Sequence, residues 1–246
     1  MAGFHTHIAV SSVVGASYGW LGMTQLQLPP ESAAVAGGLC AIAGILPDVD
    51  SDSGIPARET ISFAAAVAPM LLLHRLIRTG WTSEQIFLVG VPTYLFIRFG
   101  LGGLLKRFTV HRGMFHSIPA ILIAGMVAFL LLDHVNPTVR YFKAAAVSLG
   151  YFTHLLLDEI WSVNVSGVVP KLKKSFGSAL KVFSGDGNAN SACFGILILV
   201  SVGVLRDVAI HTPPGTPTAT QSPRSPAPAA PEKLTRDLPE LEGRPY

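Results

Sequence analysis

Seven apolar stretches dominate the sequence and restrict the chain to a membrane environment. They lie at roughly 8–28, 33–47, 61–77, 86–105, 117–134, 144–160 and 192–206. A helix rises about 1.5 Å per residue, so about 20 residues are needed to cross the hydrocarbon core. Half of the residues are hydrophobic and only 13% are charged, unlike most soluble domains of this size. The pattern predicts an all-α, polytopic transmembrane bundle of about six to seven helices.

Two of these stretches, 33–47 and 192–206, are shorter than a full span. We expect them to cross only where the bilayer thins, or to cross incompletely. From His211 the composition changes sharply, because the end of the chain holds nine of the 18 prolines and little periodic apolar pattern. Such a segment cannot bury enough surface to offset its chain entropy. The sequence therefore predicts a helical membrane domain over 1–206 and a disordered, proline-rich tail over 207–246.

Charge and cysteine content exclude several classes of protein. The net charge of +3 is far below that of typical nucleic-acid-binding domains, so we expect no direct nucleic-acid binding. Cys40 and Cys193 both lie inside apolar runs, which favours packing over a disulfide or a metal pair. No Lys or Arg precedes the first apolar stretch, so the start of the chain does not resemble a cleavable signal peptide.

The order of the apolar stretches predicts that the polar clusters share one membrane face. If the first six stretches all cross, the N-terminus, the residues after 47, the loop before 117 and the end of the sixth stretch lie on the same side. That side also carries the larger number of basic residues, which indicates a cytoplasmic face by the positive-inside rule. Those residues are Arg58, Lys106, Arg107, Arg112, Lys171, Lys173, Lys174 and Lys181. We expect a multi-pass protein of the inner (plasma) membrane.

The clusters on this face are rich in histidine and aspartate. They comprise His5 and His7, then Asp48, Asp50 and Asp52, then His111 and His116, and finally His154 and Asp158. The last two residues are spaced i, i+4, which puts both on one face of a helix, as a two-ligand contribution to a metal site requires. Histidine and aspartate without cysteine suit Zn²⁺, Mn²⁺ or Fe²⁺ better than Ca²⁺. We therefore predict a shared divalent-metal site, with zinc as the first choice.

Simpler interpretations of the same residues remain open. A single histidine near a membrane interface is commonly just a hydrogen-bonded amphipathic residue, and His154 with Asp158 also fits a buried structural pair. Arg112 also fits a positive flank of the membrane. A calcium-binding loop over residues 48–59 is disfavoured, because Ser53 replaces the usual glycine and Pro56 interrupts it.

Four motifs in order, "HTH", "LPDVD", "HRGMFHS" and "HLLLDE", resemble the family of membrane-bound metal-dependent hydrolases also described as LexA-binding, inner-membrane-associated hydrolases. The resemblance covers about residues 1–185. That family is regarded as distantly related to zinc-dependent phospholipase C and P1-type nucleases, which are helical enzymes with clustered metals. The resemblance implies a metal-binding set of His7, Asp48, His111, His116, His154 and Asp158, with Asp50 as a further member. The motif "DEIWSVNVSG" departs from the shorter turn of many members.

The resemblance implies hydrolysis of a phosphoester, from a lipid or another small molecule. Two ions about 4 Å apart would suit that chemistry. We assign Asp50 (or Asp52) to orienting water as a base, and Arg112 to binding phosphate through its planar fork. The basic stretch 171–181 has apolar residues at helical spacing, so it fits an interfacial helix on an anionic leaflet or a solvated loop equally. A divalent-metal transporter and a non-catalytic membrane scaffold are the alternatives.

Overall fold

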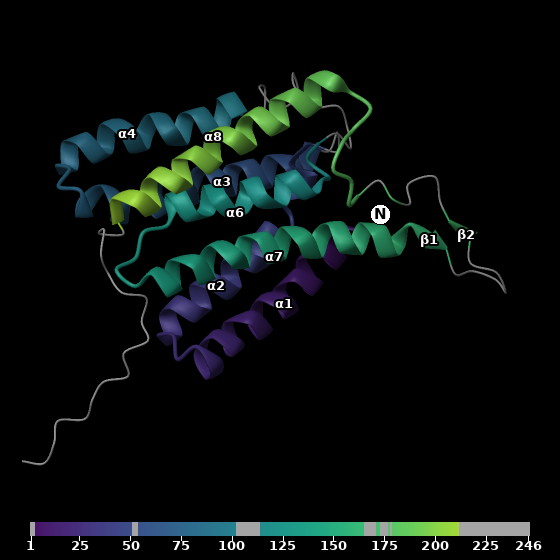
Figure 1. The fold of residues 1–246 in the computed structure, drawn as a ribbon, viewed down its shortest axis with the longest axis horizontal. Coiled ribbons are helices and arrows are strands. Elements are labelled where there is room, and N and C mark those ends of the chain that lie inside the picture. Colours follow the sequence, from purple (N-terminus) through teal and green to yellow (C-terminus); the bar gives the residue numbers. More distant parts are fainter. Residues whose placement is uncertain are drawn as a thin grey trace, which may run out of the picture. The chain divides into compact units, whose positions relative to one another are not determined.

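The chain folds largely into helices, as the computed structural model in Figure 1 shows. The structure describes residues 3–50, 54–101, 114–164, 171–172, 177 and 179–211. The α-helices are α1 (Phe4–Gln25), α2 (Pro30–Ala43), α3 (Gly54–Arg78), α4 (Ser83–Leu95), α6 (Ile118–Leu131), α7 (Pro137–Trp161) and α8 (Gly187–His211). The other elements are the 3₁₀-helix η1 (Leu46–Asp50), the π-helix η2 (Phe96–Leu101), and the two-residue strands β1 (Val163–Asn164) and β2 (Lys171–Leu172). The predicted all-α class is confirmed.

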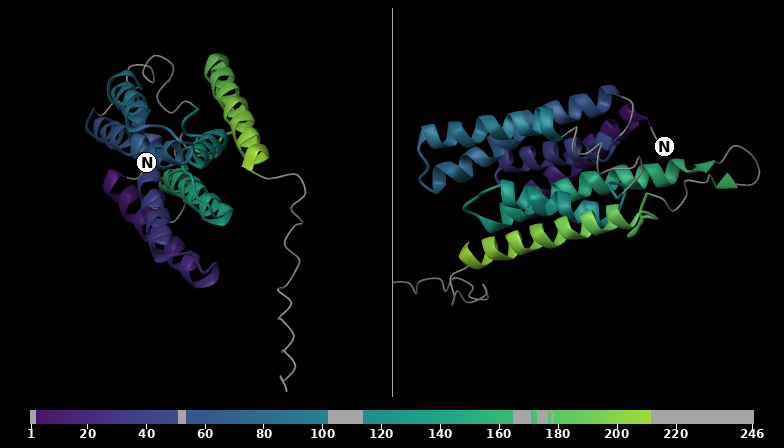
Figure 2. Two further views of the ribbon diagram at one scale, coloured as in Figure 1. Left: turned by 90° about the vertical axis from the view of Figure 1, so that its left-hand side faces the viewer. Right: turned by 90° about the horizontal axis from the view of Figure 1, so that it is seen from above.

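Glycines allow α1, α2 and α7 to approach at backbone distance. A Cβ added at Gly15 of α1 would lie 2.3 Å from the carbonyl oxygen of Gly37 in α2. A Cβ at Gly150 of α7 would lie 2.0 Å from the carbonyl oxygen of Cys40 in α2. Both distances are too short for any side chain, so the three helices pack closely only because these positions are glycine. The ribbons of α1, α2 and α7 lie side by side in Figures 1 and 2.

Caps at the helix starts fix where the polar ends of the bundle lie. α6 begins after Ser117, whose side chain accepts a hydrogen bond from the backbone N–H of Ala120. α7 begins after Asn136, whose side chain accepts from Thr138, and Pro137 occupies the first helical position. The N-terminus and the end of α7 that leads into β1 lie toward the same end of the helices (Figure 2).

α6 connects α8 to the packed helices α1, α2 and α7, since it packs against both α7 and α8. α3 and α4 form a hairpin with each other, and α4 has no buried residue of its own. Tight salt bridges join Asp207 of α8 to Arg75 of α3 and to Arg140 of α7. Arg140 also donates hydrogen bonds to the carbonyl oxygen of Phe129 in α6. Charged groups thus tie four helices together near the end of α8.

Three stretches of the described residues are long and apolar enough to cross a membrane: Pro30–Asp48, Ile61–Arg78 and Gly187–Ile210. The two stretches expected to be short are therefore longer than predicted. α8 extends beyond its apolar centre, and the stretch that begins with α2 continues through the turn after Ala43 into η1. α6 has only 14 residues, or about 21 Å of helix, and α4 gives way to a π-helix after 13 residues. α7 carries Arg140, Lys143, Asp158 and Glu159. These observations do not support the count of six to seven spanning helices.

The basic stretch 171–181 is not a helix where the structure describes it. Lys171 and Leu172 form strand β2, which pairs antiparallel with β1, and Gly177 has a φ of +77°. Residues Met1–His211 form one compact unit, and α8 continues to His211 rather than ending at 206. The predicted disordered tail beyond it lies outside the described residues and stays a prediction.

Candidate metal centre

His154 is the central side chain of a buried polar cluster. It lies on α7, one turn after the close contact at Gly150, and is fully buried. Its Nδ1–H donates a hydrogen bond of 2.7 Å to the carbonyl oxygen of Gly44 at the end of α2. A carbonyl oxygen can only accept, so the proton must sit on Nδ1 and the lone pair on Nε2. The Gly44 carbonyl thereby fixes both the tautomer and the direction of the ring.

Asp158 follows His154 by one helical turn and connects it to α1. Its Oδ1 lies 3.3 Å from Nε2 of His7, a residue that is also fully buried. The His7 ring stacks on the His154 ring, with 3.7 Å between centroids and 13° between planes. α1 and α7 therefore meet through His7 on one helix and His154 and Asp158 on the other.

Asp48 and His116 enter from two further segments. Asp48 lies in η1, directly after α2, and its Oδ1 is 3.5 Å from Nε2 of His154. His116 lies in the turn before α6, and its Nε2 is 3.6 Å from Oδ2 of Asp158. The same Oδ2 is 3.8 Å from Nε2 of His154. Four segments of the chain thus bring five polar side chains together, two of them from α7.

The spacing of these atoms fits a divalent ion. Two overlapping groups, one of His7, His154 and Asp158 and the other of Asp48, His116 and His154, each keep their ligand atoms within 4.8 Å of one another. Bonds of about 2.0–2.2 Å to a tetrahedral ion would place ligand atoms about 3.4 Å apart. Nε2 of His154 and both ring nitrogens of His116 have no hydrogen-bond partner among the described residues. Buried ring nitrogens without partners are unfavourable unless another group binds them.

Burial keeps His116 neutral and able to bind a cation. The loss of water, and then the neighbouring His154 ring, lower the pKa of His116 to about 4 from its usual 6.5. The carboxylates of Asp158 and Asp48 oppose this shift without cancelling it. At neutral pH the ring therefore carries a free lone pair, as a metal ligand requires.

Backbone contacts hold the turn that carries His116. The hydroxyl of Tyr151 on α7 donates a 2.7 Å hydrogen bond to the carbonyl oxygen of Phe115. The hydroxyl of Ser117 donates a short hydrogen bond to the carbonyl oxygen of Met114. The Gly44 and Phe115 contacts could not be predicted from the sequence, because every residue carries a backbone carbonyl. Tyr151 lies one turn before His154, and that spacing is the one signal that could have suggested its role.

The remaining predicted residues are one exposed histidine and several side chains that the structure does not describe. His5 is exposed, although His7 two positions later is buried. His111, Arg112 and the Asp50 side chain lie outside the described residues, so their predicted roles remain predictions.

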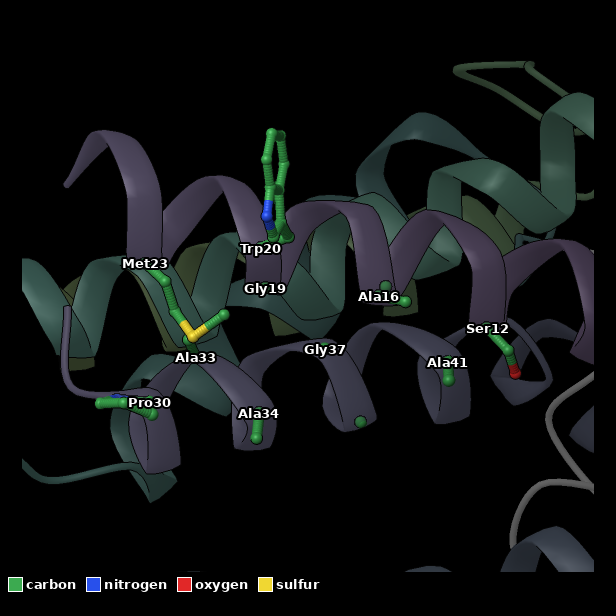
Figure 3. Close-up of a pocket in the computed structure, with 12 residues that line it drawn as sticks. Ser12, Ala16, Gly19, Trp20, Met23, Pro30, Ala33, Ala34, Gly37 and Ala41 are labelled. Carbon is green, nitrogen blue, oxygen red and sulfur yellow. The ribbon is translucent and has the colours of Figure 1, made fainter. Parts of the chain in front are cut away.

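A separate groove of about 380 Å³ runs between α1 and α2 (Figure 3). Met23 and Pro30 lie at one end, and Ser12 and Ala41 at the other. Most of its lining residues are glycine or alanine, and no residue of the buried polar cluster lines it. The groove follows from the close packing of the two helices and is distinct from the candidate metal centre.

The sequence model of the YdjM inner membrane protein family matches residues 1–212, which include every described element. No curated protein matches the chain, and no solved structure matches it.

Proposed function

The chain belongs to the YdjM inner membrane protein family, and from that premise we propose that it is a membrane-bound, metal-dependent hydrolase of phosphoesters. The observation that carries the proposal is the convergence of His7, Asp48, His116, His154 and Asp158 in one buried cluster. Metal sites that combine histidine and carboxylate ligands without cysteine suit hydrolytic ions such as Zn²⁺, with Mn²⁺ and Fe²⁺ as alternatives.

The described residues favour a single ion at the centre of the cluster. The two groups of potential ligands share His154, whose Nδ1 is committed to the Gly44 carbonyl. Only Nε2 remains, and one lone pair binds one ion. His116, His154, Asp48 and Asp158 would hold that ion, while His7 would orient Asp158 through its other oxygen. The predicted second ion would need His111 or Asp50 as further ligands.

When bound, a divalent ion supplies Lewis acidity, which activates water near neutral pH and polarises a phosphoryl oxygen. The carboxylates of Asp48 and Asp158 would balance the charge of such an ion. Asp50 would orient the attacking water as a base, and Arg112 would bind two phosphate oxygens through its guanidinium fork. Both residues lie near members of the cluster in sequence, since Asp50 follows Asp48 by two positions and Arg112 precedes His116 by four.

The proposal places the centre at the cytoplasmic face of a multi-pass protein. The cluster takes its side chains from the start of α1, from η1, from the turn before α6 and from the last turns of α7. A membrane lipid or a small phosphoester could reach a centre at such an end. A transporter would instead need ligands near the bilayer midplane with access to both faces. Convergence at one end therefore favours hydrolysis.

Elemental analysis and turnover together test the proposal. We expect purified protein to hold about one equivalent of zinc per chain and to hydrolyse a chromogenic phosphodiester. The double variant His154→Ala/Asp158→Ala removes two ligands and leaves the best helix former in α7. It should lose the metal and reduce turnover at least a hundredfold, while still inserting into the membrane. Full metal content in this variant would make the two residues a structural pair. Metal content without turnover, but with zinc flux in liposomes, would indicate a transporter.

A further inference from the structure

A short segment crosses from the end of α7 to the start of α6 beside the candidate metal centre. We call Gly177 together with Ala179–Lys181 the strap. Ala179 is buried, and Leu180 packs against Ala120, Ile121, Tyr151 and Leu155. The strap is therefore part of the packed bundle, although it is neither a helix nor a strand of a larger sheet.

Glu159 binds the first part of the strap. Its Oε1 accepts a hydrogen bond of 2.5 Å from the backbone N–H of Gly177, and its Oε2 accepts one of 3.4 Å from the N–H of Ala179. Gly177 has a φ of +77°, a conformation that glycine adopts without strain, which turns the chain so that both amides face one carboxylate. Hydrogen bonds to a charged acceptor are stronger than those between neutral groups.

The last part of the strap contacts the segment that carries His116. The backbone N–H of Ile118 donates a 3.0 Å hydrogen bond to the carbonyl oxygen of Lys181, and Ser117 pairs with Lys181 as in a parallel sheet. His116 immediately precedes these two residues and lies in a turn, where no helical hydrogen bonds fix its backbone. The strap and Tyr151 thus hold the turn from opposite sides of His116.

We propose that Glu159 is a positioning residue of the metal centre, whose carboxylate holds the strap so that the strap fixes the turn presenting His116. The metal role rests on the proposed function above. Glu159 is not itself placed as a ligand. It follows Asp158 directly and so points about 100° away around the helix, and both of its oxygens face backbone amides.

Amide hydrogen exchange and metal affinity test the inference in detergent-solubilised, full-length protein. Glu159→Ala removes both acceptors, and Glu159→Gln leaves one acceptor oxygen. Glu84→Ala serves as the matched control, because Glu84 is exposed on α4. In Glu159→Ala we expect Gly177, Ala179 and the more distant Ile118 to lose protection. We also expect a ten- to hundredfold weaker affinity for Zn²⁺, typical of lost supporting contacts. Glu159→Gln should lie between Glu159→Ala and the parent.

The visible spectrum of the protein loaded with Co²⁺ alone supplies a readout that general loosening would not produce. Glu159→Ala should reproduce the spectrum of His116→Ala, because both lose the same imidazole from the metal. Unchanged protection of Ile118, or unchanged Zn²⁺ affinity beside lost protection, would overturn the inference. A parent protein that binds no metal would instead overturn the proposed function. Exchange at Ile118 would then still decide whether Glu159 positions the His116 turn.

Discussion

Gly44 acts on the candidate centre through its carbonyl oxygen and through the side chain that it lacks. A Cβ at this position would lie 1.9 Å from Oγ and 2.4 Å from Cβ of Ser11 on α1. The backbone of Gly44 is in the right-handed helical region, so alanine is conformationally acceptable and the conflict is purely steric. Replacing Gly44 would therefore push the carbonyl away from His154.

The variant Gly44→Ala should bind Zn²⁺ about tenfold more weakly, because His154 would lose the acceptor that fixes its ring. A competition titration with a chromophoric chelator measures this. The double variant Gly44→Ala/Ser11→Gly removes both atoms that the new methyl group would strike. It should regain most of the affinity for Zn²⁺, while the new glycine in α1 should lower the stability of the protein by about 0.5–1 kcal/mol. A double variant as weak as the single one would show that the carbonyl does not act in this way.

His116 makes the stability of the metal-free protein depend on pH. Its pKa is about 4 in the folded protein and near 6.5 when unfolded, since burial disfavours the imidazolium. The unfolded chain therefore takes up the proton first, and stability is lost as the pH falls from about 6.5 to about 4. The full effect is on the order of 3 kcal/mol. Denaturant unfolding of His116→Gln should show a flatter pH profile over this window, whereas exposed His5→Gln should keep the parent's slope.

At the scale of elements, the carboxylate of Asp207 connects α8 to two other helices of the bundle. Asp207 is almost completely buried and pairs with Arg75 of α3 and Arg140 of α7. The guanidinium of Arg140 also lies over the Phe129 ring, 3.7 Å from its centroid, and Arg75 donates to the carbonyl oxygen of Leu130. The two arginines thus satisfy carbonyl groups at the C-terminal end of α6.

The variant Asp207→Asn should destabilise the protein by about 3 kcal/mol, because it leaves the buried guanidinium of Arg140 and the partly buried one of Arg75 without their counter-charge. Thermal unfolding in detergent measures this. Asp133→Asn is the matched control, since Asp133 pairs at 3.1 Å with Arg78, whose side chain is 38% exposed. The control should lose less than about 1 kcal/mol. Similar losses in the two variants would mean that burial does not set the strength of the Asp207 contacts.

The sequence predicted helices more reliably than it predicted spans. Hydropathy located the apolar centre of α8, but its polar start at Gly187 and its continuation to His211 depend on packing and capping. The histidines and aspartates of the cluster could be chosen from the sequence because their residue types are unusual in apolar helices. The backbone contacts made by Gly44, Phe115 and the strap could not be predicted from the sequence, because nearly every residue carries the same backbone N–H and C=O groups.

At the scale of the whole molecule, the proposed orientation requires the N-terminus and the strap to lie on the same face of the membrane. Single cysteines at His5, Val182, Thr79 and Val135 test it in a background without Cys40 and Cys193. In inverted inner-membrane vesicles the cytoplasmic face is outward. There we expect a membrane-impermeant thiol reagent to label the cysteines that replace Thr79 and Val135 only after lysis. His5 and Val182 should label without lysis, because the basic residues favour the cytoplasm. Labelling of His5 and Val182 from opposite sides would contradict the shared face.

The contact between His7 and Asp158 joins the first helix to the last turns of α7. Loop closure over so long a separation comes late, because the chain leaves the ribosome from its N-terminus. α1 and α2 can pair as soon as both are made, since Gly15 and Gly37 meet without help from later segments. His7 then has no contact with Asp158 until α7 has been synthesised. Under the proposed function, metal capture would therefore be a late event in biogenesis, and a ribosome stalled before α7 would leave a paired hairpin without the ligands of α7.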